Sequence, residues 1–449
     1  MGKFKTIILA AGEGSRMKSN TPKVMHKILG KPMISYVIES AKEADSEDIV
    51  VVTGYKRDIV MKQIKDVSFA YQEKQLGTGH AVMTAENFIG EEGNIIILYG
   101  DMPLITSETL RNLVQKHTET DAAVTVMSAI VEDSTGYGRI VRTEGNFSRI
   151  VEHKDANSEE ILINEINTGM YCFKAKDLKF ALSKLNNNNS QSEYYLTDTL
   201  EILLKQNLEV GTVIAKEADE FYGVNSRLQL SVACEVMKKR ININHMHEGV
   251  TIINPDATYI SKDVVIGRDT IIYPNTTIEG NTCIGENSVI GPNTNIKNSK
   301  IGDNTVVEHS VLLDSIVGNS TAVGPFAYIR PNSNIGDNVK IGDFVEVKNS
   351  NIGDNTKASH LSYIGDADVG SNVNIGCGTI TVNYDGKNKN RTIIDDNSFV
   401  GCNSNLIAPV KIGSDSYIAA GSTITENIES NSLAIARSRQ TIKKNWHLK

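Results

Sequence analysis

The sequence predicts two folds in one chain, an α/β domain with a largely parallel sheet and an all-β domain that is a parallel β-helix. From residue 1 to about 227, short apolar runs alternate with longer helical stretches, which is the pattern of an α/β domain. The C-terminal part instead repeats an aliphatic residue every six positions, and a short period of this kind is the signature of a parallel β-helix. A length of 449 residues also favours two or more domains over one core.

The composition indicates packed globular domains in a reducing compartment. Hydrophobic residues make up 40% of the chain, and the formal net charge is −8, so the basic footprint of a nucleic-acid-binding protein is missing. The five cysteines form no C-x-x-C pair and their number is odd, which indicates free thiols. The apolar run near the N-terminus is too short to span a membrane, and no cleavage pattern follows it. We expect a cytoplasmic protein with neither nucleic acid nor a membrane as a partner.

The elements of the N-terminal half follow from its apolar runs. In largely parallel sheets, ligands bind at the carboxyl ends of the strands, so the residues that follow each strand are candidates for a site. We expect strands at Thr6–Leu9, Ile49–Thr53, Asn94–Leu98, Ala122–Ala129 and Gly169–Phe173, with helices such as Met33–Ala44 and Gly79–Phe88 between them.

A Gly-rich loop follows the first strand. The string from Leu9 reads LAAGEGSRM, and Pro-Lys follows at 22–23. Two glycines let backbone N–H groups approach a phosphate chain, and Arg16 and Lys23 bring positive charge to the same place. Met17 stands where the dinucleotide motif has its third Gly, and the Walker A spacing is absent. A bare G-x-G is most often a turn, but the whole string is similar to the signature of sugar-1-phosphate nucleotidyltransferases.

Asp101 follows the apolar strand that ends near Leu98, in the sequence Tyr99-Gly100-Asp101. A carboxylate in this crevice suits Mg²⁺, which in nucleotide enzymes rests on one or two carboxylates and on phosphate oxygens. An Asp after a strand is by itself more often a turn or a cap. The Gly-rich loop beside it reverses that preference.

A helical connector is predicted over residues 228–248, where an apolar stretch ends in Lys238-Lys239-Arg240. Cationic residues in a last turn suit the helix macrodipole, and we interpret the segment as a spacer arm. The chain then divides into an N-terminal domain at 1–227, the arm at 228–248, and a repeat domain with a short tail at 249–449.

In the repeat domain, six residues form one flat face of a three-sided coil. The aliphatic residue of each hexapeptide points inward and a small residue fits the corner, as at Ile284, Ile335 and Ile412. The largest break lies between Ile375 and Ile394, where a polar, Gly-rich stretch from 382 to 391 is predicted to project as a loop. Function concentrates in loops on rigid scaffolds.

Polar residues at unusual places set this coil apart from an inert one. His360 is the natural general base at neutral pH, and it has basic and phenolic neighbours close to the predicted loop. A lone His is more often structural, and hexapeptide coils also occur as plain oligomerisation domains. The unusual residues are Arg330, Lys348, His360, Tyr363, Asn374 and Asn383-Tyr384.

Taken together, these pieces resemble one bacterial family over essentially the whole chain, the bifunctional N-acetylglucosamine-1-phosphate uridylyltransferase / glucosamine-1-phosphate N-acetyltransferase. The resemblance implies a Rossmann-like nucleotidyltransferase domain, a helical arm, a left-handed β-helix and a C-terminal tail. Further segments of the N-terminal half that carry it are Gln72–His80, Gly136–Arg139, Val151–Asp155, Asn164–Gly169 and Gly223–Arg227.

The resemblance implies acetyl transfer in the C-terminal domain, where the amine of glucosamine-1-phosphate attacks the thioester of acetyl-CoA and His360 is the general base. Arg330 and Lys348 are then expected to hold the sugar phosphate, and Tyr363 and Asn374 to orient the sugar. The expected acetyl-CoA contacts are Cys377, Asn383, Tyr384, Cys402, Ala420 and Arg437. Other members have Ala and Ser at the two cysteine positions, so we expect sensitivity to thiol reagents.

In the N-terminal domain the resemblance implies that the phosphate of N-acetylglucosamine-1-phosphate attacks the α-phosphorus of UTP, which releases pyrophosphate and forms UDP-N-acetylglucosamine. The nucleophile is already ionised, so alignment and charge neutralisation carry the reaction. Asp101 and Asn225 are expected to hold one or two Mg²⁺ ions, and Arg16 and Lys23 to stabilise the phosphates. The expected nucleotide-sugar site is Leu9, Ala10, Ala11, Gly12, Lys23, Gln72, Gly77, Thr78, Tyr99, Gly100, Asp101, Gly138, Glu152, Asn167 and Asn225. Gln72, Gly77 and Thr78 are expected to read uracil, and Gly138, Glu152 and Asn167 to hold the amino sugar.

The family's known properties complete the expectation. Its substrates are small molecules, its product feeds peptidoglycan and lipopolysaccharide synthesis, and it forms homotrimers through the β-helix, with the acetyl-transfer sites at subunit boundaries.

Three other interpretations compete with this one. The chain could be a single-activity nucleotidyltransferase with a structural β-helix, and His360 with the Asn383-Tyr384 loop discriminates against that. It could be a scaffold with a degenerate N-terminal domain, which the intact set of Arg16, Lys23, Asp101 and Asn225 opposes. It could use another sugar or base, such as glucose-1-phosphate with dTTP or ATP, and only the resemblance argues against that.

Overall fold

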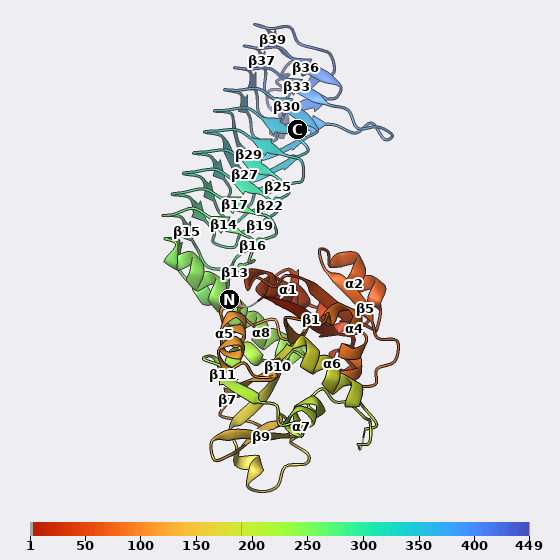
Figure 1. Ribbon diagram of the computed structural model, residues 1–449. Coiled ribbons are helices and arrows are strands. Elements are labelled where there is room, and N and C mark those ends of the chain that lie inside the picture. The colour runs from red at the N-terminus through yellow and green to blue at the C-terminus, as the bar shows by residue number, and fades with distance from the viewer. Residues whose placement is uncertain (1–2, 190, 449) are drawn as a thin grey trace. The chain divides into compact units, whose positions relative to one another are not determined.

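The computed structural model describes residues 3–189 and 191–448 and consists of two compact units, Met1–Met237 and Lys238–Lys449 (Figure 1). Helix α8 (Arg227–His247) covers nearly all of the predicted connector, and the division between the units falls inside it. None of the described helices is long and apolar enough to cross a membrane.

The N-terminal unit is built on a mixed, mostly parallel sheet, as predicted. The strand order is β11 (Val210–Ile214), β7 (Val124–Ile130), β10 (Glu165–Lys174), β6 (Asn94–Tyr99), β1 (Phe4–Ala10), β4 (Ile49–Thr53) and β5 (Ser68–Tyr71). The central strands β6, β1, β4 and β5 are parallel, whereas β10 runs antiparallel to both β6 and β7.

Helices cover both faces of this sheet, and this explains why its central strands are almost continuously apolar. Along β1, Ile8 packs into one core and Ile7 and Leu9 into the other. The first core includes residues of α1 (Met33–Glu43), α2 (Arg57–Gln63) and α5 (Ser107–Thr120). The second includes residues of α3 (Thr78–Met83), α4 (Glu86–Ile89), α6 (Ala175–Lys184) and α7 (Asp198–Leu204).

The predicted elements are present, with two local differences. The helix expected over Gly79–Phe88 is two short helices, because the chain turns at Thr84, whose hydroxyl donates to the carbonyl of Ala81 at 2.6 Å. The last predicted strand is longer than expected and is irregular where Gly169 adopts a φ of 79°.

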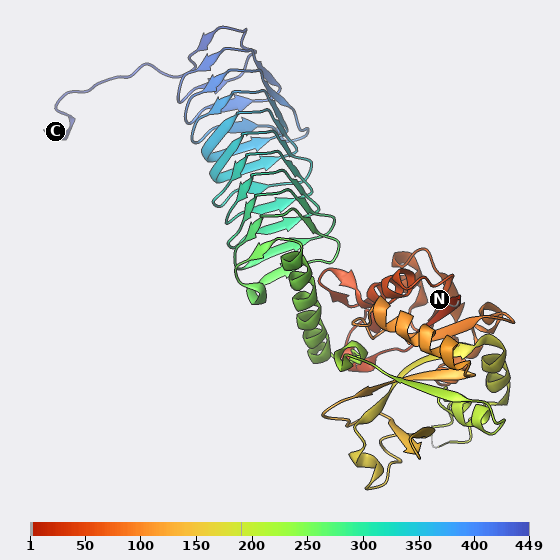
Figure 2. The same cartoon turned by 60° about the vertical axis from the view of Figure 1, so that its left-hand side comes forward.

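The C-terminal unit is a parallel β-helix of stacked coils, seen side-on in Figure 2. Each inward aliphatic residue stands in register on the corresponding residue of the coil before it. One such column runs from Ile260 through Ile278 and Ile296 to Leu312 and Ile329, and all five side chains are fully buried. The hexapeptide period therefore becomes a continuous apolar core along the coil.

Buried hydroxyl groups form hydrogen bonds between neighbouring coils at a corner, and we call this set of groups the hydroxyl ladder. The side chain of Thr305 donates to the carbonyl of Gly318 at 2.7 Å and accepts from the N–H of Thr321 at 3.3 Å. The N–H of Thr305 in turn donates to the hydroxyl of Ser288 at 3.1 Å. These bonds satisfy backbone groups that would otherwise be buried without a partner, so the small corner residues of the repeat are hydrogen-bonded as well as small.

Two features interrupt the regular coil. Strands β27 (Lys340–Lys348) and β29 (Lys357–Gly365) are paired and run through a corner without a break. The polar stretch between β32 (Ile380–Val382) and β33 (Thr392–Ile394) projects as a loop, as predicted (Figure 1). Arg391 anchors the loop through two contacts to Asp368, each at 2.5 Å.

We predict that Thr305→Val destabilises the β-helix. The substitution keeps the volume but removes the hydroxyl, so the N–H of Thr321 and the carbonyl of Gly318 lose a buried partner. The expected loss in free energy of unfolding is about 1–3 kcal/mol, measured by urea unfolding followed by circular dichroism. Thr305→Ser, which keeps the hydroxyl, is the control; a valine variant as stable as the wild type would contradict the role given to the hydroxyl ladder.

Candidate active sites

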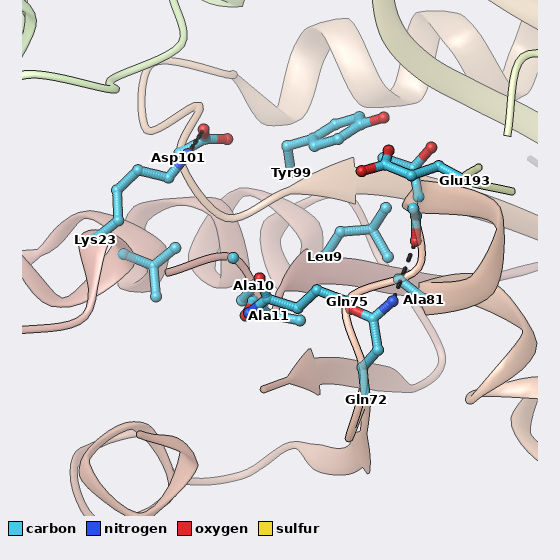
Figure 3. Close-up of a pocket in the computed structure, with 14 residues that line it drawn as sticks. Leu9, Ala10, Ala11, Lys23, Gln72, Gln75, Ala81, Tyr99, Asp101 and Glu193 are labelled. Atoms are coloured by element: carbon cyan, nitrogen blue, oxygen red, sulfur yellow. Dashed lines mark hydrogen bonds and ion pairs between the residues drawn. The ribbon is translucent and has the colours of Figure 1, made fainter. Parts of the chain in front are cut away.

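A pocket opens at the carboxyl ends of β1 and β6 in the N-terminal unit (Figure 3). The Gly-rich loop, the segment after β5 and the end of β6 all contribute to it. Ten residues of the predicted nucleotide-sugar site line this pocket: Leu9, Ala10, Ala11, Gly12, Lys23, Gln72, Gly77, Thr78, Tyr99 and Asp101.

The Gly-rich loop places Lys23 through close packing. Gly14 has a φ of 69°, and a Cβ there would lie 2.5 Å from the Cβ of Lys23. Both the backbone conformation and this contact therefore require glycine. The Lys23 side chain is largely buried and extends to Asp101, with Nζ 2.5 Å from Oδ2 of the carboxylate and 2.9 Å from Oδ1 of Asn225.

Asp101 and Asn225 thus converge on one cation, the ammonium group of Lys23. A carboxylate oxygen and an amide oxygen are also the ligands that Mg²⁺ takes from proteins, so this pair fits a hard divalent ion. Among residues 3–189 and 191–448, no group of three or more His, Cys, Asp or Glu side chains is placed to hold a metal. A metal on this pair would therefore complete its coordination with substrate phosphate oxygens and water.

Gln72 is held rigidly at the far side of the pocket. It is 4% exposed, and its Nε2 lies 3.1 Å from the carbonyl of Gly77 and 3.0 Å from Nδ1 of His80. Both contacts use the amide nitrogen, which leaves Oε1 as an acceptor. Gly77 has a φ of 105°, and a Cβ there would lie 2.5 Å from the carbonyl oxygen of Tyr194, so the loop at residue 194 can approach only a glycine.

The predicted amino-sugar residues also come together. A Cβ on Gly138 would lie 3.5 Å from Oε1 of Glu152 and 3.7 Å from the Cβ of Asn167. Burial, and then the charges of Asp155 and Asp198, raise the pKa of Glu152. Tyr99 links this group to the first pocket: burial, and then the charges of Asp101 and Glu152, raise its pKa.

Six predicted residues do not line the pocket: Arg16, Gly100, Gly138, Glu152, Asn167 and Asn225. Arg16 lies exposed on a short helical turn (Ser15–Met17), and Gly100 packs beneath the pocket against Val24 and Ala10. The sequence interpretation also missed three residues. His80 orients Gln72, Gln75 donates to the carbonyl of Ala11 at 2.7 Å, and Glu193 lines the pocket. The first two belong to the Gln72–His80 segment, whereas Glu193 has no motif that could have revealed it.

In the C-terminal unit, His360 lies at the corner through which β27 and β29 pass. Its register partner on the preceding coil is Asp343, and Nδ1 of His360 is 2.7 Å from Oδ1 of Asp343. This contact lowers the pKa of Asp343. In the coils that follow, the same register position is occupied by Cys377, Cys402 and Ala420. Together with Asp343 and His360, these residues form what we call the corner column.

Three of the predicted acetyl-CoA residues therefore stand in one column with His360. Arg437 also belongs to this corner, because its Cδ lies 3.9 Å from a Cβ placed on Gly421, the residue after Ala420. None of these relations depends on another copy of the chain.

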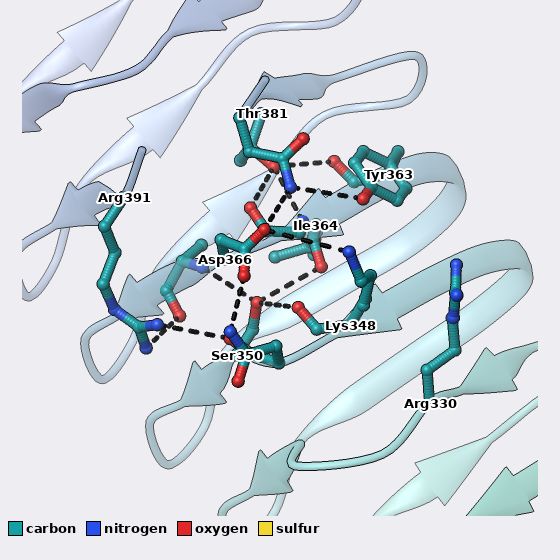
Figure 4. A network of polar contacts seen from close by, with 12 residues as sticks. Arg330, Lys348, Ser350, Tyr363, Ile364, Asp366, Thr381 and Arg391 are labelled. Carbon is teal, nitrogen blue, oxygen red and sulfur yellow. Dashed lines mark hydrogen bonds and ion pairs between the residues drawn. The ribbon is translucent and has the colours of Figure 1, made fainter. Parts of the chain in front are cut away.

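A second group lies at the next corner, where Arg330, Lys348, Asp366 and Lys389 line a cleft. Figure 4 shows Arg330, Lys348 and Asp366 of this group. Contact with the Lys348 side chain and its positive charge lower the pKa of Lys389. Nζ of Lys348 is 4.0 Å from Oδ2 of Asp366, and Nη1 of Arg330 is 2.7 Å from Oε1 of Glu346. Three cations thus surround a cleft with fewer anions, which suits a phosphate group. Lys389, in the projecting loop, was not predicted.

Asp366 organises this corner. Burial opposes its ionisation, but hydrogen bonds from Asn349 and Asn383, each at 2.5 Å, hold its pKa below the ordinary value. Nδ2 of Asn383 is also 3.4 Å from the hydroxyl of Tyr363, whose ring lies across Gly365.

Two predicted residues stand apart from this group. Tyr384 is 57% exposed on the projecting loop. Asn374 lies on the face that leads into the His360 corner, beside Lys357 and Asn355, whereas Tyr363 lies on the face that follows it. The chain by itself does not bring Asn374 to the cationic cleft.

Models of known protein families match residues in both units of the chain. A nucleotidyl transferase family model matches residues 5–220, a GMPPB C-terminal domain model matches residues 259–333, and a bacterial transferase hexapeptide model of six repeats matches residues 391–426.

Full-length relatives match across both units. The "Bifunctional protein GlmU" of Caldanaerobacter subterraneus subsp. tengcongensis is 56% identical over 448 residues, which are 99% of this chain and 98% of the relative. Proteins of the same name from Acetivibrio thermocellus and Clostridioides difficile are each 54% identical, over 99% of this chain and 97% of the relative. Identity at this level along the whole length shows that the chain belongs to the family of bifunctional GlmU proteins.

Proposed function

We propose that the two sites described above carry the two reactions of a bifunctional transferase that makes UDP-N-acetylglucosamine. The chain acetylates glucosamine-1-phosphate with acetyl-CoA in its β-helix and then transfers a uridylyl group from UTP to N-acetylglucosamine-1-phosphate in its N-terminal domain. The observation that carries this assignment is the presence of two separate polar sites, one at the strand ends of the α/β sheet and one on the β-helix.

At the N-terminal site, the triphosphate of UTP lies against the backbone of the Gly-rich loop and beside Lys23. Asp101 and Asn225 would hold Mg²⁺, which when bound neutralises phosphate charge. Oε1 of Gln72 accepts from the N3–H of uracil, since its Nε2 is engaged by Gly77 and His80. Gly138, Glu152 and Asn167 hold the amino sugar. The attacking phosphate is ionised at neutral pH, so these residues act by alignment and charge.

We predict that Lys23→Met lowers uridylyl transfer by about 100- to 1,000-fold, because it removes the cation nearest the reacting phosphates. The measurement is pyrophosphate release from UTP and N-acetylglucosamine-1-phosphate. Acetyl transfer by the same variant should be unchanged. Lys27→Met, at an exposed lysine on the following strand β2 (Lys27–Ile28), is the matched control. Equal rates for the two variants would exclude Lys23 from the reaction.

At the C-terminal site, His360 takes a proton from the amine of glucosamine-1-phosphate while the nitrogen attacks the acetyl thioester. Asp343 holds Nδ1, so the free ring nitrogen is Nε2, the atom that accepts the proton. The sugar phosphate lies in the cleft formed by Arg330, Lys348 and Lys389. The Cys377–Ala420 column beside His360 supports placing the thioester of acetyl-CoA at that corner.

We predict that His360→Ala lowers acetyl transfer by about 100-fold or more, because it removes the general base that accepts the amine proton. Free CoA is measured after mixing glucosamine-1-phosphate and acetyl-CoA without UTP. His247→Ala, at an exposed histidine of α8, is the control. CoA release at the wild-type rate from the His360 variant would remove this residue from the reaction.

We also propose that the chain forms a homotrimer through its β-helix and acts in the cytoplasm. The support for the trimer is an apolar column at the His360 corner. Phe326, Phe344 and Leu361 are 56%, 58% and 58% exposed, although all three are large and apolar. The rings of Phe326 and Phe344 stack with centroids 5.4 Å apart. A second copy of the chain covers this column, which brings the subunit boundary next to His360.

We predict that the double substitution Phe326→Ser, Phe344→Ser dissociates the trimer, since it removes the apolar contact area without touching the coil core. Sedimentation at micromolar concentration should give a trimer for the wild type and a smaller species for the variant. The exposed Tyr417→Ser is the control at another part of the coil. A trimeric double variant would mean that another face mediates the assembly, and a monomeric wild type would exclude the trimer.

A further inference from the structure

The corner column contains an acid, an imidazole and a thiol on three successive coils. Asp343 lies on β27, His360 follows on β29, and Cys377 follows in the turn after β31 (Asn374–Ile375). Only the first contact, the hydrogen bond between Asp343 and His360, is part of the proposed acetyl transfer to the sugar. The thiol has no role in that reaction.

The register that places Cys377 over His360 is fixed on both sides of the corner. Before it, Ala358 pairs with Ile375, and after it, Tyr363 pairs with Ile380. Both pairs are offset by the same 17 positions that separate His360 from Cys377. The N–H of Gly378 also donates to the carbonyl of Leu361 at 2.7 Å, directly beside the two residues.

Side chains in a column of this kind lie over one another. Adjacent strands are about 4.8 Å apart, so register partners are within reach of each other's side chains. In the neighbouring column of the same corner, the Phe326 and Phe344 rings stack at an angle of 10°. Cys377 is partly exposed and His360 more so, and thus both can meet a ligand from solvent.

The order acid, imidazole, thiol is the arrangement that activates a cysteine nucleophile. Asp343 engages Nδ1 of His360 from the preceding coil, so the free nitrogen is Nε2. Nε2 can take the proton of a thiol on the following coil, and the resulting thiolate is a strong nucleophile.

We propose that Cys377 is an acetyl acceptor, so that the β-helix forms a covalent S-acetyl-cysteine from acetyl-CoA in the absence of sugar. His360 removes the thiol proton, and Sγ of Cys377 attacks the thioester carbonyl. The new bond joins Sγ to the acetyl carbon. The bond from that carbon to the CoA sulfur breaks, and His360 returns the proton to the leaving thiolate. One thioester replaces another, and no oxidant or further reactant is needed.

Asp343 is a positioning residue in this scheme. It fixes the ring of His360 through Nδ1 and does not touch the acetyl group. Cys402, the next residue of the column, lies one coil further from His360 and is not adjacent to the imidazole. The scheme therefore selects one of the two column cysteines.

This inference rests on the proposed acetyl-CoA site, and it is tested by isotope exchange with the full-length protein. Labelled CoA is incubated with unlabelled acetyl-CoA and no glucosamine-1-phosphate. A covalent acetyl-enzyme moves label into acetyl-CoA, whereas direct transfer to a sugar gives no exchange without the sugar. Peptide mass spectrometry on the same sample should find one acetyl group on Cys377.

Five variants define the result. Cys377→Ala and Cys377→Ser, which preserves side-chain size, should lower the exchange rate about tenfold or more, and so should His360→Ala. Cys283→Ala, which removes an exposed thiol from a distant coil, should exchange like the wild type. Asp343→Asn should slow exchange and leave the sugar phosphate site unaffected, as read from the KM for glucosamine-1-phosphate.

The outcomes separate the two proposals. If the wild type acetylates glucosamine-1-phosphate but shows neither exchange nor acetyl-Cys377, the covalent step is wrong and the proposed acetyltransferase stands. Exchange that persists in both Cys377 variants, or an acetyl group found on another cysteine, would also overturn the assignment. If neither sugar acetylation nor exchange occurs, the acetyl-CoA site itself has been misplaced.

Discussion

Main-chain hydrogen bonding between successive coils is the constraint on which the C-terminal unit depends. Each coil is held in register by backbone bonds to its neighbours, such as those from Gly302 to Val317 and from Gly336 to Ile352, each at 2.8 Å. Because the register is fixed, the distance between two side chains follows from their places in the hexapeptide and not from separate packing at each position. Residues far apart in the sequence become stacked neighbours, as Asp343 and His360 do.

The N-terminal site is assembled on a different principle. Lys23, Asp101 and Asn225 come from three separated segments, and the interactions that unite them are electrostatic. The rigid sheet supplies only the strand end before Asp101. The remaining precision comes from glycines that permit close approach, Gly14 against Lys23 and Gly77 against Tyr194. The same chain therefore assembles one polar site from converging loops and a second polar site from a repeated coil.

The sequence was sufficient for both folds, because each has a periodicity that survives local variation. The aliphatic residue at every sixth position predicted the coil, and the break in this repeat after Ile375 predicted the projecting loop. The strand-end motifs predicted most of the residues that line the pocket at the ends of β1 and β6, since backbone chemistry restricts what can follow a strand there. Side-chain partners without a motif were missed: Glu193 reaches the pocket from a loop, and Lys389 joins the cationic cleft from the projecting loop. The pairing of His360 with Asp343 depends on the register between coils, and the offset between paired residues is not constant: it is 18 positions from Ala322 to Lys340 and 17 from Asp343 to His360.

The column architecture separates the length of the scaffold from its chemistry. Coils before residue 320 carry the same inward aliphatic residues and hydroxyl ladder as those near the active corners, yet they contribute no residue to either polar site. A complete coil can be gained or lost in that region during evolution while the register above it is preserved, because every coil presents the same backbone donors and acceptors to the next. The number of coils before residue 320 can thus diverge among relatives at little cost, whereas a single-residue insertion between 343 and 360 would take Asp343 out of register with His360.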